Sequence, residues 1–318
     1  MKISELVIGT RHVIPLVVLG ATARETKTKK PYLALELYDG TDKINGNYWD
    51  WQGKNIPEPN TILNVSAQVT EWQGVKQLNI SGLSINHDLY ISEFTPSSGI
   101  DIGKVYMDAY EMATELRNDF LRNLLVSVLE DLQHRWLTVP AAISIHHAYA
   151  AGTLVHCLSV AKLAGVLGQN IEGADVELCI AGGLLHDLGK LFGYQINGVV
   201  CEMTDDGKLM EHSFLGAHFI SNYAEELKIV KTGLDVLKVD ILRHIILSHH
   251  GTLEHGAAVF PCSLEAHIVH HADALDSTAD MIREACRKVN DTMWTDRIYA
   301  LNNRPHLTIE HVQEAMLD

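Results

Sequence analysis

Cysteines are few in this sequence, and they follow no recognisable pattern. The five residues are odd in number and far apart, and no pair is separated by only two residues. This excludes a disulfide framework and a cysteine-based zinc site, because both need paired or closely spaced thiols. We expect free thiols in a reducing compartment, and we place the protein in the cytoplasm.

Long apolar runs are also absent. None approaches the ~20 residues that a membrane-spanning helix needs, so we expect no membrane association. Residues 13–21 follow basic residues and resemble the apolar part of a signal peptide. The segment contains Pro15 and leads directly into a charged, strand-like stretch, which favours a first β-strand instead.

Positive charge is scarce. The chain has 25 Lys and Arg against 40 Asp and Glu, and its net charge is −15. Residues 1–95 are close to neutral, so the rest of the chain carries almost all of the excess. This argues against a protein that coats duplex nucleic acid, because basic side chains drive such binding. An acidic, histidine-rich region can instead host metal cations.

The N-terminal part has the pattern of a small β-protein. Turn signals separate five strand-like runs, at 13–24, 32–38, 43–49, 62–71 and 76–85. Five short strands predict a barrel. The oligonucleotide/oligosaccharide-binding fold (OB-fold) is the commonest barrel of this size, and an SH3-like barrel is the alternative.

From residue 104 onward the pattern turns helical. Apolar residues at about 3.6-residue spacing from Met107 to Leu132 predict one long amphipathic helix. Further helices are predicted at 151–168, 175–192, 212–228, 234–249, 263–288 and 308–316, and a loop or small hairpin lies within 191–211. The predicted organisation is a barrel at 1–88, a linker at 89–103 and an all-α domain at 104–318.

Histidines gather in the helical region, where 16 of the 18 lie. A single helical histidine is usually packed or solvated, but several converging buried imidazoles would repel one another when protonated. A shared metal ion resolves this conflict. His and Asp suit Mn²⁺, Fe²⁺, Co²⁺, Ni²⁺ or Zn²⁺, and Mg²⁺ where oxygen dominates. An adjacent pair such as His186-Asp187 can also bridge two ions that activate water and stabilise a phosphoryl oxygen.

The order of these residues resembles a known signature. His156, the segment 184–190 (LLHDLGK) and Asp273 resemble the H…HD…D pattern of HD-domain phosphohydrolases. The barrel-like start, Tyr48-Trp49-Asp50, His146-His147 and the segment 248–251 (SHHG) extend the likeness to YhaM-type 3′→5′ exoribonucleases, over about residues 5–290. The resemblance implies an OB-fold followed by an HD-domain bundle. It also implies hydrolysis of single-stranded RNA to nucleoside monophosphates, and it leaves single-stranded DNA open as a further substrate.

The resemblance also implies roles for single residues. The first divalent ion would be held by His156, His186, Asp187 and Asp273. The second would be held by His212, His249 and His250, with Asp187 bridging. Asp187 and Lys190 would be catalytic, Lys190 through a phosphate contact, although a solvated helix residue is the alternative for Lys190. For His146 and His147, substrate contact, support of a ligand and metal ligation all stay open, whereas ligand support is expected of Asp276 and a structural role of His270 and His271.

Aromatic and basic side chains in the barrel suit a single-strand binder. The predicted binding residues are Lys30, Tyr32, Tyr48, Trp49 and Trp51. Single-strand binders stack bases on such rings and place basic groups along the backbone. The alternative for each ring is a place in the barrel core.

Two other functions remain open at this point. One keeps the site but makes the protein an HD-domain nucleotide or cyclic-dinucleotide phosphohydrolase with a regulatory barrel. The sequence contains no GYP tripeptide, which weakens the cyclic-dinucleotide version. The other is a non-catalytic protein that binds metal or nucleic acid, and the complete set of apparent ligands argues against it. A homo-oligomer is compatible with each of these functions.

Overall fold

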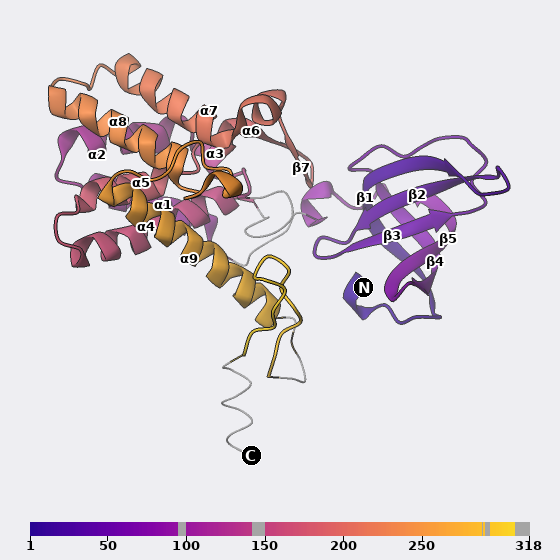
Figure 1. The fold of residues 1–318 in the computed structure, drawn as a ribbon. Coiled ribbons are helices and arrows are strands. Elements are labelled where there is room, and N and C mark those ends of the chain that lie inside the picture. Colours follow the sequence, from indigo (N-terminus) through magenta and orange to yellow (C-terminus); the bar gives the residue numbers. More distant parts are fainter. Residues whose placement is uncertain (95–99, 142–149, 288, 290–292, 309–318) are drawn as a thin grey trace. The chain divides into compact units, whose positions relative to one another are not determined.

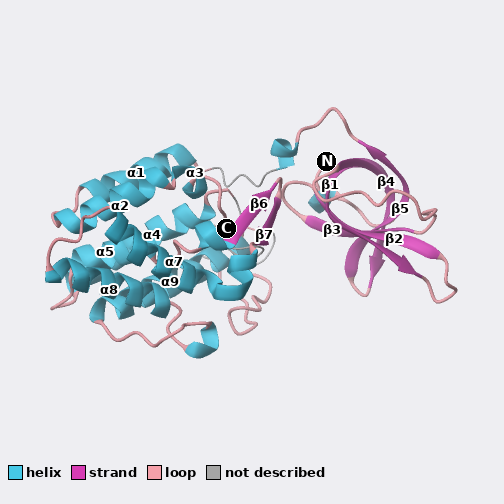
Figure 2. Ribbon diagram, turned by 90° about the horizontal axis from the view of Figure 1, so that it is seen from above, coloured by secondary structure: helices cyan, strands magenta, loops and turns pink. Residues whose placement is uncertain are grey.

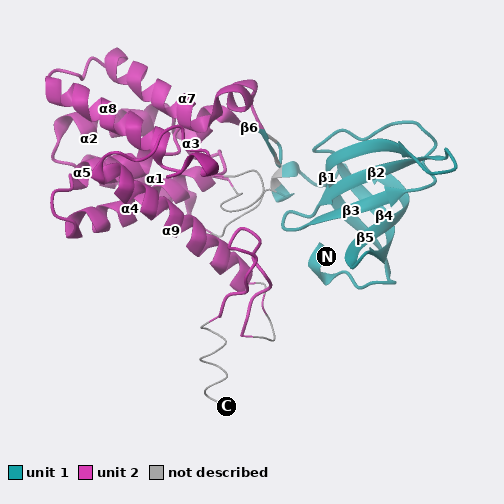
Figure 3. Cartoon of the chain, in the orientation of Figure 1, with its two compact units in different colours: residues 1–98, 196–202 teal, residues 99–195, 203–318 magenta. Residues whose placement is uncertain are grey.

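The computed structural model describes residues 1–94, 100–141, 150–287, 289 and 293–308. The chain forms two compact units (Figure 3). The barrel unit comprises residues 1–98 and 196–202, and the helical unit comprises 99–195 and 203–318. Each unit has its own apolar core. The predicted succession of a small barrel and a helical bundle is confirmed.

The barrel unit is a closed five-stranded barrel in the order β1-β2-β3-β5-β4 (Figure 1). Its strands are β1 (Arg11–Glu25), β2 (Pro31–Tyr38), β3 (Lys43–Tyr48), β4 (Ile62–Trp72) and β5 (Val75–Ile85). β3 and β5 pair in parallel, and all other neighbours pair antiparallel. The barrel is OB-like, and all five predicted strand runs are present.

Side chains alternate between the inside and the outside of the barrel. On β2, Leu33, Leu35 and Leu37 are buried in the core, which Figure 2 shows enclosed by a ring of strands. Gly46 faces inward on β3, where an added Cβ would lie 2.6 Å from the side chain of Ile80. Because alternate residues point outward, the outer face of β1, β2 and β3 is left to polar side chains.

The turn of a short hairpin belongs to the barrel unit. β6 (Tyr194–Asn197) and β7 (Val200–Met203) form this hairpin. The Val199 N–H donates to Asn60 Oδ1 at 3.0 Å. Val199 also packs against an apolar cluster that contains Tyr38, whose pKa is raised to about 12 by burial and by the neighbouring Asp39 and Asp42. The sequence predicts a loop or a small hairpin within 191–211, and the hairpin is correct for residues 194–203.

The helical unit contains most of the helices. They are α1 (Ile102–Thr114), α2 (Asp119–Asp131), α3 (Gln133–Trp136), α4 (Gly152–Asn170), α5 (Val176–Leu185), α6 (Lys190–Gly193), α7 (Asp205–Glu226), α8 (Gly233–Ser248) and α9 (Leu264–Cys286). Short 3₁₀ turns lie at Ile3–Glu5, Ile91–Phe94 and Leu253–His255. α4, α5 and α9 pack on one another, and α7 packs on α8. None of the described helices combines the length and apolar character that a membrane span requires.

The single long helix predicted from Met107 to Leu132 is wrong. α1 ends at Thr114, and Asn118 caps α2 by accepting a hydrogen bond from the Leu121 N–H at 3.0 Å. Glu177, on α5, accepts from the backbone N–H groups of Arg117 and Asn118 at 2.8 Å each. These acceptors satisfy N–H groups that would otherwise be unpaired at the break, which stabilises two helices over one.

Two other helix boundaries differ from the prediction. The helix expected at 175–192 is divided into α5 and α6. The stretch 204–211, expected as loop, is helical from Asp205 because Thr204 caps α7, although Glu211 interrupts α7 with a φ of 61°. The helix predicted at 308–316 lies outside the described residues apart from Thr308, which is not helical.

Candidate metal centre

The His186-Asp187 pair lies at the end of α5, where both side chains are buried. His186 Nδ1 donates to the Gly183 carbonyl oxygen at 2.8 Å, which directs Nε2 away from its own helix. The turn continues through Gly189, where an added Cβ would lie 1.8 Å from the carbonyl oxygen of His212. Only glycine therefore permits α7 to approach the motif this closely.

Three side chains form a first ligand cluster: His156 on α4, His186, and Asp273 on α9. Their ligand atoms all lie within 4.8 Å of one another. His156 Nε2 lies 3.1 Å from His186 Nε2 and 3.1 Å from Asp273 Oδ1. Two imidazole nitrogens at this distance cannot both carry protons directed at each other, so at least one presents a lone pair.

His212 on α7 and the neighbours His249 and His250 form a second ligand cluster, whose ligand atoms also lie within 4.8 Å of one another. His249 Nδ1 donates to the Ile246 carbonyl oxygen at 2.7 Å. Burial lowers the pKa of His212 to about 3 and holds that of His249 well below its usual value. Both imidazoles are thus neutral at physiological pH and can donate a lone pair.

Asp187 lies between the two clusters. Its Oδ2 is 3.5 Å from Nε2 of His156 and of His186. Its Oδ1 is 3.4 Å from Nε2 of His212 and 3.7 Å from Nε2 of His249. The carboxylate therefore directs one oxygen to each cluster.

Lys190 pairs with this carboxylate, since its Nζ donates to Asp187 Oδ2 at 2.7 Å. Burial by itself raises the pKa of Asp187, but Lys190 and the surrounding imidazoles outweigh it and hold that pKa well below its usual value. Lys190 is only 8% exposed, so the alternative of a solvated helix residue is wrong.

The donor atoms fit divalent metal ions. Asp187 Oδ1, His212 Nε2, His249 Nε2 and His250 Nδ1 are buried and have no hydrogen-bond partner among the described residues. Burial by itself lowers the pKa of His156, but hydrogen bonds to Asp273 and Asp276 raise it to about 9. The first cluster thus attracts a positive charge, and nitrogen and oxygen donors suit borderline divalent cations.

Asp276 holds the ring of His156. His156 Nδ1 donates to Asp276 Oδ2 at 2.8 Å, and Ser159 donates to the other oxygen of the same carboxylate. Such contacts fix the tautomer and the orientation of a metal-binding histidine. His271 is exposed, whereas His270 contacts the backbone of His249. His146 and His147 lie outside the described residues.

The aromatic residues predicted to bind nucleic acid divide into two groups. Tyr32 and Trp49 form a pair with ring centroids 4.4 Å apart and planes tilted by 31°, and Trp49 is 40% exposed. Lys30, near this pair in sequence, forms an ion pair with Asp50 at 3.1 Å. Tyr48 and Trp51 pack partly against the barrel core. The Tyr32–Trp49 pair therefore offers the more accessible ring surface.

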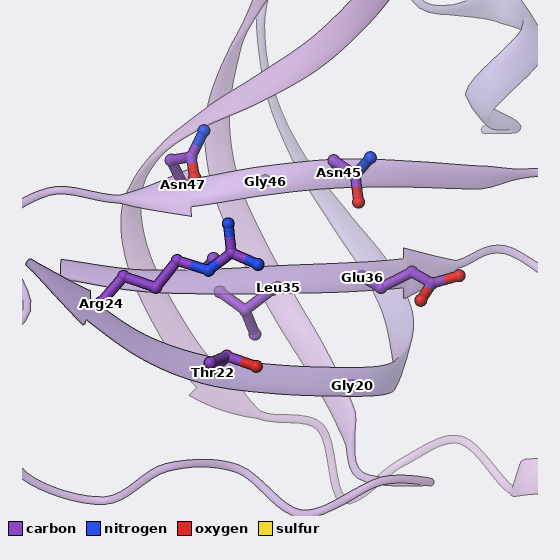
Figure 4. A pocket seen from close by; sticks show the side chains of 9 residues that line it. Gly20, Thr22, Arg24, Leu35, Glu36, Asn45, Gly46 and Asn47 are labelled. Atoms are coloured by element: carbon purple, nitrogen blue, oxygen red, sulfur yellow. The ribbon is translucent and has the colours of Figure 1, made fainter.

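A shallow pocket of about 380 Å³ lies on the outer face of β1, β2 and β3 (Figure 4). Its polar lining residues are Thr22, Arg24, Glu36, Asn45 and Asn47. Strand pairing places Gly20, Glu36 and Asn45 in one row across the sheet, and Thr22, Ala34 and Asn47 in the next. The pocket thus presents amide, hydroxyl and charged groups on a sheet surface.

Comparison with known proteins agrees with this geometry. Residues 153–278 match the family model described as "HD domain", and they include both ligand clusters and Asp187. This part of the chain is an HD domain. Over 303 residues the HD-domain chain is 29% identical to the 3′-5′ exoribonuclease YhaM of Geobacillus sp. (strain WCH70), covering 93% of this chain and 91% of that protein. The predicted resemblance is confirmed, and the protein is a hydrolase that contains an HD domain.

A solved structure also matches part of this HD-domain protein. It is a domain of replication protein A from Methanococcus maripaludis, 29% identical and covering 27% of this chain and 92% of its own. The TM-score is 0.24.

Several residues near the HD-domain site and on the barrel were not predicted from the sequence. Ser159 follows His156 by three residues on α4, and this spacing on one helix face could have indicated it. Asn45 and Asn47 alternate with the buried Ile44 and Gly46 on β3, so the period of two could have placed them outside. A structural role was expected of His270, but its contact with His249 has no such local signal, because that contact depends on where another helix ends.

Proposed function

We propose that this HD-domain hydrolase is a metal-dependent 3′→5′ exoribonuclease that degrades single-stranded RNA to nucleoside monophosphates. The observation that carries the proposal is the position of Asp187, with one carboxylate oxygen directed to each ligand cluster. Two-ion sites of this kind suit hydrolysis of phosphodiester bonds. The exoribonuclease name of the Geobacillus relative supports RNA as the substrate.

In this proposal each cluster holds one divalent ion, for which Mn²⁺ is the first candidate, and Asp187 contributes to both. When bound, the ions activate water and stabilise the phosphoryl oxygens. The protein keeps the ligands ready, because the Nδ1 groups of His156, His186 and His249 all donate to protein acceptors. The Nε2 atoms of these rings are thereby directed to the centre.

Lys190 has a defined part in the same proposal. It donates to Asp187 Oδ2 and keeps that carboxylate ionised and oriented. Its ammonium group lies one helical turn from the ligand pair, so a phosphate oxygen that reached Asp187 would also come near Lys190. The predicted phosphate contact of Lys190 is retained as part of the proposal.

The barrel would hold the RNA strand. The Tyr32–Trp49 pair offers ring surface on which bases can stack. Asn45 and Asn47 line the neighbouring pocket, and their amides can bond the edges of unpaired bases. Arg24, which lines the same pocket, and Lys30 would contact backbone phosphates. The Watson–Crick edges of a single strand are free for such contacts, whereas those of a duplex are not.

The direction and the substrate can be tested with one RNA labelled at either end. With Mn²⁺, the 3′-labelled RNA should release labelled mononucleotide at once, whereas the 5′-labelled RNA should shorten stepwise. His186→Ala with Asp187→Ala should abolish both reactions. Single-stranded DNA, free nucleotides and cyclic dinucleotides serve as competing substrates. Internal cleavage, release from the 5′ end, or faster hydrolysis of free or cyclic nucleotides would overturn the proposal.

The role of the barrel needs a separate test. Trp49→Ala should raise KM for RNA by about 5-fold or more, since stacking of one base contributes roughly 1–3 kcal/mol. Hydrolysis of a small phosphodiester that does not reach the barrel should stay unchanged. Trp72→Ala is the matched control, because Trp72 is 66% exposed at the end of β4 and does not line the pocket. Equal effects of both substitutions would contradict a binding role for the Tyr32–Trp49 pair.

A further inference from the structure

His270 connects α9 to the chain segment that follows α8. Its Nδ1 lies 2.6 Å from the carbonyl oxygen of His249. A carbonyl can only accept, so Nδ1 carries the proton and donates it. His249 is one of the three residues of the second ligand cluster. The hydrogen bond is therefore made to the backbone of His249 and does not involve its imidazole ring.

The ring of His270 also packs against the same segment. Gly251 has a φ of +79°, and an added Cβ would lie 2.2 Å from Cε1 and 2.4 Å from Nε2 of His270. The imidazole thus occupies the space that a side chain at position 251 would need. Both the hydrogen bond and this packing fix the backbone on either side of His250.

The end of α8 explains why such a contact is needed. The last carbonyl groups of a helix have no partner within the helix. α8 ends at Ser248, so the carbonyl of His249 lies just beyond its last turn. His249 also uses its own Nδ1 to bond the Ile246 carbonyl oxygen. With the His270 bond added, both the ring and the backbone of His249 are held.

The same helix carries a ligand of the other cluster. Asp273 follows His270 on α9 by three residues, which is about one turn. α9 therefore supplies Asp273 as a ligand of the first cluster and His270 as a hydrogen-bond donor to the backbone of the second. We infer that His270 is a positioning residue that sets the second ligand cluster relative to the first. The inference rests on the proposed two-ion centre.

Binding of Mn²⁺ to the full chain tests this inference by calorimetry. Wild type should bind two ions. His270→Leu removes the donor, and it should weaken the second ion by about 10–100-fold while the first is unchanged. In the His270→Leu variant, the ion that still binds tightly is the first one. Adding His156→Ala to this variant should abolish its binding, whereas adding His250→Ala should not. His271→Leu, at the exposed neighbour, is the control and should bind as wild type does.

Two further variants keep the test decisive if His270→Leu does not fold. Asn places its amide nitrogen where Nδ1 lies, so His270→Asn should restore the affinity for the second ion. Gln places its nitrogen one bond farther out, so His270→Gln should not restore it. Equal affinity in these two variants, or equal weakening of both ions in His270→Leu, would overturn the inference. Wild type that binds fewer than two ions would overturn the two-ion centre as well, and two ions unaffected by His270→Leu would overturn the inference alone.

Discussion

The ligand imidazoles differ in what holds them. His186 and His249 each donate Nδ1 to the carbonyl of the residue three positions earlier, so their own helices orient them. His156 instead donates to Asp276, which lies 120 residues away in the chain. Its orientation therefore depends on a side chain from another helix. Of these three imidazoles, His156 is the one whose Nδ1 acceptor lies on another helix.

Replacement of Asp276 should expose this dependence. Asp276→Ala removes the acceptor of His156 and of Ser159, and we expect binding of the first ion to weaken by about 10–100-fold. Calorimetry with Mn²⁺ measures the effect. Asp240→Ala, at an exposed residue paired with Arg243, is the control. Unchanged affinity in Asp276→Ala would show that His156 needs no such support.

Gly189 provides a second test at a single residue. Gly189→Ala places a Cβ 1.8 Å from the carbonyl oxygen of His212, so α7 must shift. We expect a loss of about 1–3 kcal/mol in the free energy of unfolding, together with weaker binding of the second ion. Urea unfolding and calorimetry measure the two effects.

Gly233 is the matched control for Gly189. It is the first residue of α8, and an added Cβ would meet nothing within 4 Å. Gly233→Ala should be neutral or stabilising by about 0.4–1 kcal/mol, because alanine reduces the freedom of the unfolded chain. If both variants lose the same stability, the close approach at Gly189 is not the cause.

Among the elements, the break between α1 and α2 shows what local pattern can and cannot reveal. All five strands of the barrel follow from alternation and turn residues that are close in sequence. The break depends on Glu177, which lies 60 residues from Arg117. The apolar residues of α1 and α2 pack into one core, so their period runs on across the gap.

The candidate site shows the same division between what the sequence predicts and what it leaves out. The motif residues from His156 to Asp273 were predicted because their types and order are distinctive. The pairing of Asp276 with Ser159 and of His270 with a carbonyl could not be predicted in full, because both depend on how helices cross.

The cap of α2 can be tested as an element. Asn118→Ala removes the acceptor for the Leu121 N–H, so the free energy of unfolding should fall by about 1 kcal/mol. Urea unfolding should show a lower midpoint with an unchanged slope. Affinity for both ions should stay unchanged, because α1 and α2 carry no ligand of either cluster. A loss of metal binding would mean that the break positions the centre.

For the whole molecule, the distribution of charge sets how RNA binding responds to salt. The net charge is −15, and residues 1–95 are close to neutral. Each phosphate contact to a single strand contributes about 0.7 to the slope of log affinity against log salt. A barrel with few basic side chains at its pocket should therefore bind RNA mainly through ring and amide contacts.

This predicts a shallow salt dependence. The slope of log KM for RNA against log salt concentration should be about 0.7–1.4, equivalent to one or two phosphate contacts. Arg24→Gln should lower it by about 0.7, whereas Lys208→Gln, at an exposed residue on α7, should not change it. KM measurements over a series of NaCl concentrations give the slope. A steep slope would point to a longer electrostatic track than this barrel offers.

The hairpin at 194–203 has a consequence for how this chain can be divided. Val199 completes the apolar cluster around Tyr38 and bonds Asn60, although it follows the HD motif in sequence. A single cut near residue 100 would leave a barrel fragment without Val199, and a second fragment with an apolar turn but no cluster to cover. The two units are therefore expected to be inherited as one piece. A barrel exchanged between relatives would have to bring a matching hairpin turn with it.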